Sequence, residues 1–223
     1  MSRLNLTADE VLTTTRSVRK RLDFDRPVER EVIDECLDIA LQAPTGSNSQ
    51  GWQWVFVTDA EKKKVIADYY VANFDLYTNR AEQPVYAEGD PRTAQRPRVL
   101  DSATYLREHF HKAPVMMIPC IVSGSGRLDT GTPTFGQAGA WGSILPAVWS
   151  FMLALRERGL GSAWTTLHFP NEREVAELLG IPYDTVTQAG LFPIAYTKGT
   201  DFKLAKRLPG SELSHWDSWN PSE

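Results

Sequence analysis

The sequence predicts an α+β fold in which a mixed central sheet is flanked by helices. Apolar residues recur at three-to-four spacing in the segment 28–42, which is the period of a helix with one buried face, and the segment 144–158 predicts a strongly apolar helix. Aromatic and β-branched runs at 52–57, 113–122 and 185–196 are instead typical of strands. The two kinds of segment do not alternate regularly along the chain, and this order favours an α+β sheet over a doubly wound fold.

Capping signals place the first helices of the chain. Thr7 followed three residues later by Glu10 forms a capping box, which begins a short helix. The periodic segment 28–42 is a second helix, and Asp59 provides the N-cap of a third. The predicted buried face of that third helix consists of Val65, Ile66 and Tyr69.

Two long stretches show no sustained period and predict loops. The polar stretch from about 79 to 98 contains Pro84, Pro91 and Pro97, so we expect an extended segment of the kind that often covers a site. Residues 123–139 are rich in Gly, Ser and Thr and predict a second long loop. The two loops bound an excursion from the core at about 79–139.

The remaining elements follow from apolar runs and capping residues. The strand at 113–122 is interrupted by Pro114 and Pro119, which is unusual for a buried strand. The later elements are the helix 144–158 closed by Gly159, a strand at 161–167, a helix capped by Asn171 with Glu174, and the strand 185–196.

Composition bounds the kind of protein. A chain of 223 residues with 42% apolar residues can bury one substantial core, so we expect a single domain over 1–223 with a C-terminal arm at about 200–223. Lys and Arg number 24 against 28 Asp and Glu, and the net charge of −4 argues against a nucleic-acid coat or a binder of anionic membranes.

The cysteines and the N-terminus indicate the compartment. Cys36 and Cys120 lie far apart inside apolar runs and belong to no Cys-x-x-Cys or Cys-His cluster, which favours buried thiols over a disulfide or zinc ligands. Residues 1–7 lack the apolar segment of a signal peptide, and no stretch approaches the roughly 18 apolar residues of a membrane span. We therefore expect a cytoplasmic protein with no membrane and no nucleic-acid partner.

Three short polar motifs, far apart in the sequence, carry the functional information. Arg16-Ser17-Val18-Arg19 offers two rigid forks of donors beside a hydroxyl, and these suit a phosphate or a paired carbonyl edge. The loop 44–52 offers small residues and free backbone amides, and Lys206-Arg207 precede a segment with two tryptophans, 211–219. Taken singly, the motifs also fit a solvated helix end, an ordinary turn and a frayed tail. Taken together, they predict a split site for a phosphorylated planar cofactor.

The order and spacing of these motifs resemble the nitroreductase family of FMN-dependent oxidoreductases. Its usual runs are Arg-Ser-(Ile/Val)-Arg, Pro-Ser-x-x-Asn-x-Gln-Pro-Trp and Arg-x-Pro-Leu…His-Trp-x-x-Trp. The resemblance covers 16–219, least closely over 79–139, and implies a nitroreductase-like sheet in an intertwined homodimer with an exchanged C-terminal tail. In two places the sequence departs from the family: Gly51 stands where Pro is usual, and Trp149-Ser150 stand where many relatives carry Gln-Asn.

The resemblance also implies roles for individual residues. The residues matching Arg16 and Ser17 hold the FMN phosphate, and the one matching Arg19 reaches the pyrimidine edge, where a cation stabilises the charge of the reduced flavin. Lys206 and Arg207 clamp the phosphate from the tail. The other implied cofactor contacts are the backbone amides of Thr166 and Leu167 and, across the dimer interface, Pro44, Thr45, Gly46, Asn48 and Gln50.

No residue pattern predicts a metal site or a catalytic side chain. His109 and His111 lack a third ligand at a recognisable offset, and no signature suggests a Ser-His-Asp or Cys-His arrangement. Gly159-Leu160-Gly161 follows a helix and precedes a strand, the reverse of a dinucleotide fingerprint, and fits a helix C-cap. We therefore expect the flavin itself to carry the chemistry.

The implied activity is hydride transfer from NADH or NADPH through flavin N5 to a small-molecule acceptor such as a nitroaromatic or quinone, in a ping-pong scheme. Two alternatives stay open. One is a specialised FMN-dependent dehydrogenase or reductase on the same scaffold. The other is a flavin-binding redox sensor without turnover.

Overall fold

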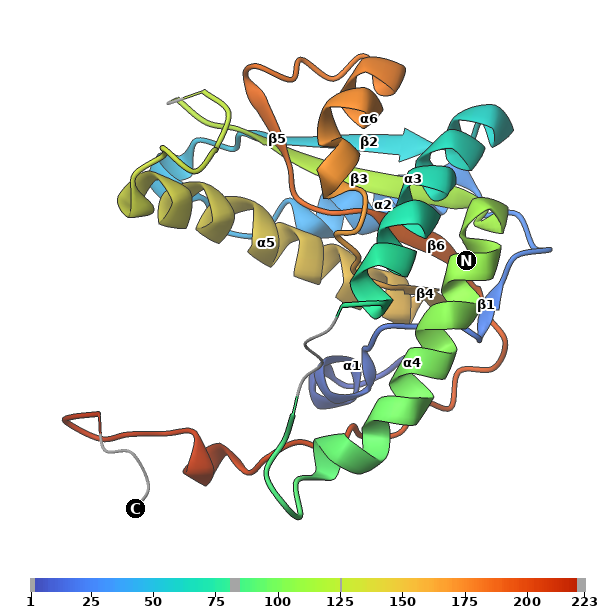
Figure 1. Ribbon diagram of the computed structural model, residues 1–223, viewed down its shortest axis with the longest axis vertical. Coiled ribbons are helices and arrows are strands. Elements are labelled where there is room, and N and C mark those ends of the chain that lie inside the picture. Colours follow the sequence, from blue (N-terminus) through green and yellow to red (C-terminus); the bar gives the residue numbers. More distant parts are fainter. Residues whose placement is uncertain (1–2, 81–84, 125, 220–223) are drawn as a thin grey trace.

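The computed structural model describes residues 3–80, 85–124 and 126–219, in which helices surround one sheet (Figure 1). The helices are α1 (Ala8–Thr14), α2 (Arg30–Ala40), α3 (Ala60–Thr78), α4 (Pro91–His109), α5 (Thr134–Glu157) and α6 (Glu172–Leu179). The strands are β1 (Leu22–Asp23), β2 (Trp52–Val57), β3 (Val115–Val122), β4 (Leu160–Ser162), β5 (Val186–Gln188) and β6 (Phe192–Thr197). The predicted α+β class is confirmed. The sheet was expected to be mixed, but all pairs of these named strands are antiparallel.

Strand β3 is the centre of the sheet. It runs antiparallel to β2 along one edge. On the other edge its residues 115–117 pair with β6 and its residues 120–122 pair with β5, both antiparallel. Strand β6 also pairs with β1 and β4, again antiparallel. A parallel bridge joins Ser17 to Ser162 and brings the first polar motif to the end of β4.

Pro119 fits inside β3 because it lies where the neighbouring strand on one edge changes from β6 to β5. Its carbonyl accepts a hydrogen bond from the Ala189 amide at 2.7 Å, in the gap between β6 and β5. The nitrogen and carbonyl of one strand residue face the same edge, so the missing donor of Pro119 falls in this gap and the pairing with β2 is intact. The predicted strand at 113–122 is therefore correct from Val115 onward.

Helices cover both faces of the sheet. Met117 and Ile121 of β3 enter an apolar cluster with α2 and α5, whereas Met116 and Ile118 enter a second cluster with α3, α6 and the end of α4. The two predicted buried thiols lie in different clusters and are fully buried, and burial raises the pKa of each to about 12. These thiols are Cys36 and Cys120.

The expected loop at 79–98 is wrong for its second half, which is helical. Helix α4 begins at Pro91, because the Asp90 carboxylate accepts a hydrogen bond from the Arg92 amide and proline suits the first helical position. The helix continues through Pro97, whose lost hydrogen bond is outweighed by packing further along. Residues 81–84 of the expected loop lie outside the described residues.

The expected loop at 123–139 is also too long. Helix α5 begins at Thr134 rather than near 144, and the Gln137 side chain ties its first turn to the Thr132 carbonyl at 2.8 Å. Its small residues carry no apolar period, which hid this turn in the sequence. Among the described residues α5 is the one helix long and apolar enough to cross a membrane, where none was expected, and half of its most apolar window is buried.

Three smaller expectations are corrected. The single strand at 185–196 is split into β5 and β6 at Gly190, which has φ 148° and no room for a side chain beside Trp164 and Phe192. The strand expected at 161–167 spans 160–162 and then turns away. On α3, Ile66 is buried, but Val65 is exposed.

The expected N-cap of α6 is also corrected. Asn171 occupies the predicted N-cap position, but its side chain makes no capping hydrogen bond. Its amide oxygen instead accepts a hydrogen bond from Asn73 of α3 at 3.0 Å. The residue therefore joins two helices.

Candidate functional site

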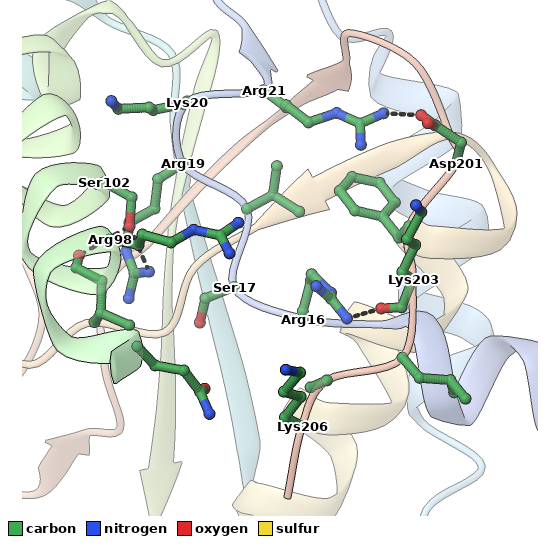
Figure 2. A pocket seen from close by; sticks show the side chains of 16 residues that line it. Arg16, Ser17, Arg19, Lys20, Arg21, Arg98, Ser102, Asp201, Lys203 and Lys206 are labelled. Atoms are coloured by element: carbon green, nitrogen blue, oxygen red, sulfur yellow. Dashed lines mark hydrogen bonds and ion pairs between the residues drawn. The ribbon is translucent and has the colours of Figure 1, made fainter. Parts of the chain in front are cut away.

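A cavity of about 740 Å³ lies between the first polar motif, helix α4 and the start of the C-terminal tail (Figure 2). Its walls are residues 16–21, residues 201–206 and one face of α4. This volume is within the range of small-molecule and cofactor sites. Segments from near the N-terminus and near the C-terminus therefore line the same cavity.

The first motif is held rigidly by the core behind it. The Val18 amide donates to the Ser162 carbonyl at 2.8 Å, and the Val18 side chain is buried. It packs so closely on Gly161 that an added Cβ there would lie 2.9 Å from it. Anchoring at Val18 fixes the backbone of Arg16, Ser17 and Arg19, which all line the cavity.

Arg16 and the C-terminal tail meet in this cavity. The Arg16 guanidinium donates to the Lys203 carbonyl, as Figure 2 shows, and Lys206 lines the same cavity. Burial lowers the pKa of Arg16, and the positive charge of Arg207 lowers it further, so the two guanidinium groups lie near each other. The buried Nε of Arg16 has no hydrogen-bond partner among the described residues. A phosphate would supply both the missing acceptor and the missing negative charge.

Arg19 lies deeper in the cavity wall. Its guanidinium reaches Ser102 of α4, with Nη1 at 3.4 Å from the hydroxyl oxygen. Burial lowers its pKa, and Tyr70 opposes that shift. The cation is therefore directed at the interior of the cavity rather than at bulk water.

The loop 44–50 does not reach this cavity within one chain. It lies against the first half of α5, where the Gly46 amide donates to the Ser143 hydroxyl at 3.1 Å. Ser47, Asn48 and Gln50 adopt positive φ values of 53°, 51° and 49°, which are uncommon for residues other than glycine. Backbone strain of this kind is concentrated at functional sites.

The close packing of the backbone explains why glycine, and not proline, stands at position 51. A Cβ added at this position would lie 2.4 Å from the Val122 carbonyl oxygen, so no side chain fits this backbone. The departure from proline is thus tied to the close pairing of Gly51 with Val122, whose amide donates to the Gly51 carbonyl at 2.9 Å.

Thr166 and Leu167 follow β4 in a turn that does not line the cavity either. Their backbone amides donate no hydrogen bond within the described part of the chain. They remain free to bind another group. The cavity thus unites Arg16, Ser17, Arg19 and Lys206, with Arg207 beside it, and leaves the other predicted contacts apart.

A buried polar network supports the turn at 166–167. The Gln188 side chain donates to the Glu172 carbonyl at 2.9 Å, so its own oxygen accepts from Nε2–H of His168 at 3.1 Å. Glu172 also pairs with Arg127. His168 is fully buried, its Nδ1 has no partner among the described residues, and burial lowers its pKa to about 4.

Sequence reasoning missed the third wall of the cavity. Gln95, Arg98 and Ser102 of α4 all line it. Their spacing of three and four residues puts them on one helix face. The helix-start signal at Asp90-Pro91 could have revealed this face, but the nearby prolines favoured a loop.

The C-terminal tail leaves the body of the chain (Figure 1). Trp216 is 82% exposed and Trp219 is 79% exposed, although Trp219 stacks on His215 at 4.4 Å between ring centroids. The resemblance implies a C-terminal tail that is exchanged between subunits, and such a tail would dock these rings on the partner. Within one chain they do not.

Comparisons with known proteins agree with this geometry. The model of the nitroreductase family matches residues 12–196. A protein of Archaeoglobus fulgidus provisionally named NADH dehydrogenase/NAD(P)H nitroreductase is 23% identical over 213 residues, which is 94% of this chain and 97% of that protein.

Solved structures show the same fold. The FMN and NADPH-dependent nitroreductase NfnB of Sphigopyxis sp. strain HMH aligns with a TM-score of 0.67 at 23% identity, covering 96% of this chain and 100% of that one. Iodotyrosine deiodinase bound to FMN and 3-iodo-L-tyrosine also aligns with a TM-score of 0.67, at 22% identity and with the same coverage. Because the family model matches most of its length, the chain belongs to the nitroreductase family.

Proposed function

We propose that this protein is an FMN-dependent oxidoreductase that passes electrons from NADH or NADPH to a small-molecule acceptor. The observation that carries the proposal is the joining of Arg16, Ser17 and Lys206, with Arg207 close by, in one cavity with a buried, unpartnered Arg16 Nε. The FMN and NADPH dependence of NfnB supports it.

The chain's residues fit FMN better than a dinucleotide. Arg16, Ser17, Lys206 and Arg207 would hold a single terminal phosphate, and Arg19 would face the pyrimidine edge. When bound, FMN supplies a carrier that accepts a hydride and passes it on. In this arrangement Arg19 stabilises negative charge at the pyrimidine edge, and the free amides of Thr166 and Leu167 would orient the opposite edge.

We further propose a homodimer with shared sites, each subunit forming a single domain. The loop 44–50 would pack against the flavin of the neighbouring subunit, because its strained backbone lies away from the cavity of its own chain. The exposed Trp216 and Trp219 would dock on that neighbour, since burying two large rings releases ordered water.

The protein's part in the reaction is to bind, orient and shield. No side chain needs to act as nucleophile, so a nicotinamide donor and an acceptor such as a nitroaromatic or quinone can use the same cavity in turn. Helix α4 would cover that cavity while a substrate is bound, and it would exclude water from the transfer.

A specialised reductase is the second candidate. The observation that favours it is the equal structural similarity to iodotyrosine deiodinase. Release of halide from a halogenated aromatic, with no nitroaromatic turnover, would select this candidate. A redox sensor would instead be reduced by NADH or NADPH without multiple turnovers.

The test starts with the purified protein. We expect a yellow protein whose released cofactor is FMN, bleached by NADH or NADPH without oxygen and reoxidised by menadione through many turnovers. FAD in place of FMN, or no flavin after reconstitution, would refute the proposal. If the bound flavin were reduced but no acceptor reoxidised it, the protein would still be an FMN-binding protein, but the proposed enzymatic activity would be refuted.

A further inference from the structure

The cavity carries more positive charge than one phosphate requires. Its cationic lining side chains are Arg16, Arg19, Lys20, Arg21, Arg98, Lys203 and Lys206. Asp201 is the acidic residue in the same lining, and it already pairs with Arg21 at 2.6 Å. A terminal phosphate brings about two negative charges, which Arg16 and the tail cations can balance. The remaining cations need another explanation.

Arg98 stands out among these cations. Lys20 pairs with Asp101 at 2.5 Å, and Arg19 reaches Ser102. Arg98 makes no hydrogen bond or ion pair with any residue that the structure describes. Figure 2 shows its guanidinium extending from α4 into the cavity, on the side of Arg19 and Ser17. It is therefore a free, fixed-charge donor aimed at the space that a ligand would fill.

The attachment of α4 suits a substrate rather than a cofactor. Leu106, in the last third of the helix, is its one fully buried residue, and the Arg107–Asp75 ion pair holds the same end. Near Arg98 the helix is held by polar contacts, and Val99 is 52% exposed. A helix segment without core packing can move aside at small free-energy expense. Arg98 can thus admit and release ligands while the phosphate site stays fixed.

We propose that Arg98 binds the anionic group of a redox substrate, so that this enzyme favours substrates that carry a carboxylate or phosphate beside the reducible part. The inference rests on the proposed function. Two sources share this chemistry: an aromatic carboxylate acceptor, and the additional phosphate that distinguishes NADPH from NADH. Gln95 and Ser102, on the same face of α4, offer further hydrogen bonds to such a group.

The test compares matched substrates on the flavin-loaded protein. One pair of acceptors is 4-nitrobenzoate and the neutral 4-nitrobenzyl alcohol, and the pair of donors is NADPH and NADH. Arg98→Gln should lower the kcat/KM preference for the charged member of at least one pair about tenfold, because a charge-assisted hydrogen bond is lost. Arg98→Lys, which retains the positive charge, should keep part of this preference. Arg96→Gln removes the same charge from the same helix outside the cavity lining and should keep the preference.

A binding measurement separates this inference from the proposed function. The dissociation constant of benzoate, followed through the flavin absorbance spectrum, should rise about tenfold in Arg98→Gln with unchanged flavin content. Unchanged preferences in both substrate pairs would overturn the inference and leave the flavoenzyme intact. Loss of flavin in Arg98→Gln would assign Arg98 to the cofactor and also overturn it. A wild-type protein that binds no flavin would refute the proposed function, and this inference with it.

Discussion

Acidification should destabilise this protein through one buried side chain, His168. Its Nε2–H donates to Gln188, and its Nδ1 faces no acceptor among the described residues. Protonation would therefore place a charge and an unsatisfied donor in the core, and burial lowers the pKa of His168 to about 4. An unfolded histidine has a pKa of about 6.5. Between these two values the unfolded chain binds more protons than the folded one.

The sign and size of the effect follow from linkage. Stability from neutral His168 is complete above pH of about 6.5 and is lost as the pH falls toward about 4. A gap of about 2.5 pH units corresponds to about 3 kcal/mol in total. Between pH 7 and pH 5 we expect a loss of about 2 kcal/mol in the free energy of unfolding.

Urea unfolding at pH 7, 6 and 5, followed by tryptophan fluorescence at one protein concentration, measures this loss. His168→Gln should be less stable than wild type at pH 7, but its stability should fall by about 2 kcal/mol less between pH 7 and pH 5. His215→Gln is the control, because His215 lies in the C-terminal tail, outside both apolar clusters of the core. Equal pH dependence in wild type and His168→Gln would refute the reasoning.

Other predictions concern the cofactor, the dimer and the fold. Arg207→Ala should weaken FMN binding by about 1.5–3 kcal/mol in a fluorescence titration, and unchanged affinity, equal to that of the surface control Arg30→Ala, would remove Arg207 from the site. Truncation after Leu208 should weaken dimer and FMN binding together in sedimentation and titration, whereas a flavin-loaded full-length monomer would contradict the shared site. Gly190→Ala should lower the melting temperature by several degrees, because its Cβ would lie 2.7 Å from a buried phenylalanine ring, and Gly210→Ala, in open space, should not.

Local signals predicted those parts of the fold that local interactions determine. The Thr7–Glu10 capping box forms as expected, and the aromatic run at 52–57 is strand β2 with those bounds. Elements that depend on contacts between residues far apart in the sequence were harder to predict. The division between β5 and β6 at Gly190 depends on packing against Trp164, which the sequence around Gly190 does not encode.

The candidate site divides in the same way. Arg16 and Lys206 could be paired from their motifs, although they are far apart in the chain, because a phosphate needs such donors. Arg98 could not be assigned to the site from the sequence, because its place in the cavity depends on α4 being a helix with a defined face. The loop 44–50 does not meet the cavity of its own chain, so no single-chain argument could decide its partner.

The cations of the cavity are better explained by a ligand than by the fold. Within the chain alone they oppose one another, since burial and the charge of Arg207 both disfavour the charged form of Arg16. An arginine nevertheless stays charged at any working pH, so this unfavourable interaction persists in the ligand-free protein. Binding of an anion removes it and adds charge-assisted hydrogen bonds. The ligand-free protein should therefore gain stability from phosphate-bearing ligands in particular, by mass action, and FMN should raise its melting temperature where riboflavin, which lacks the phosphate, does not.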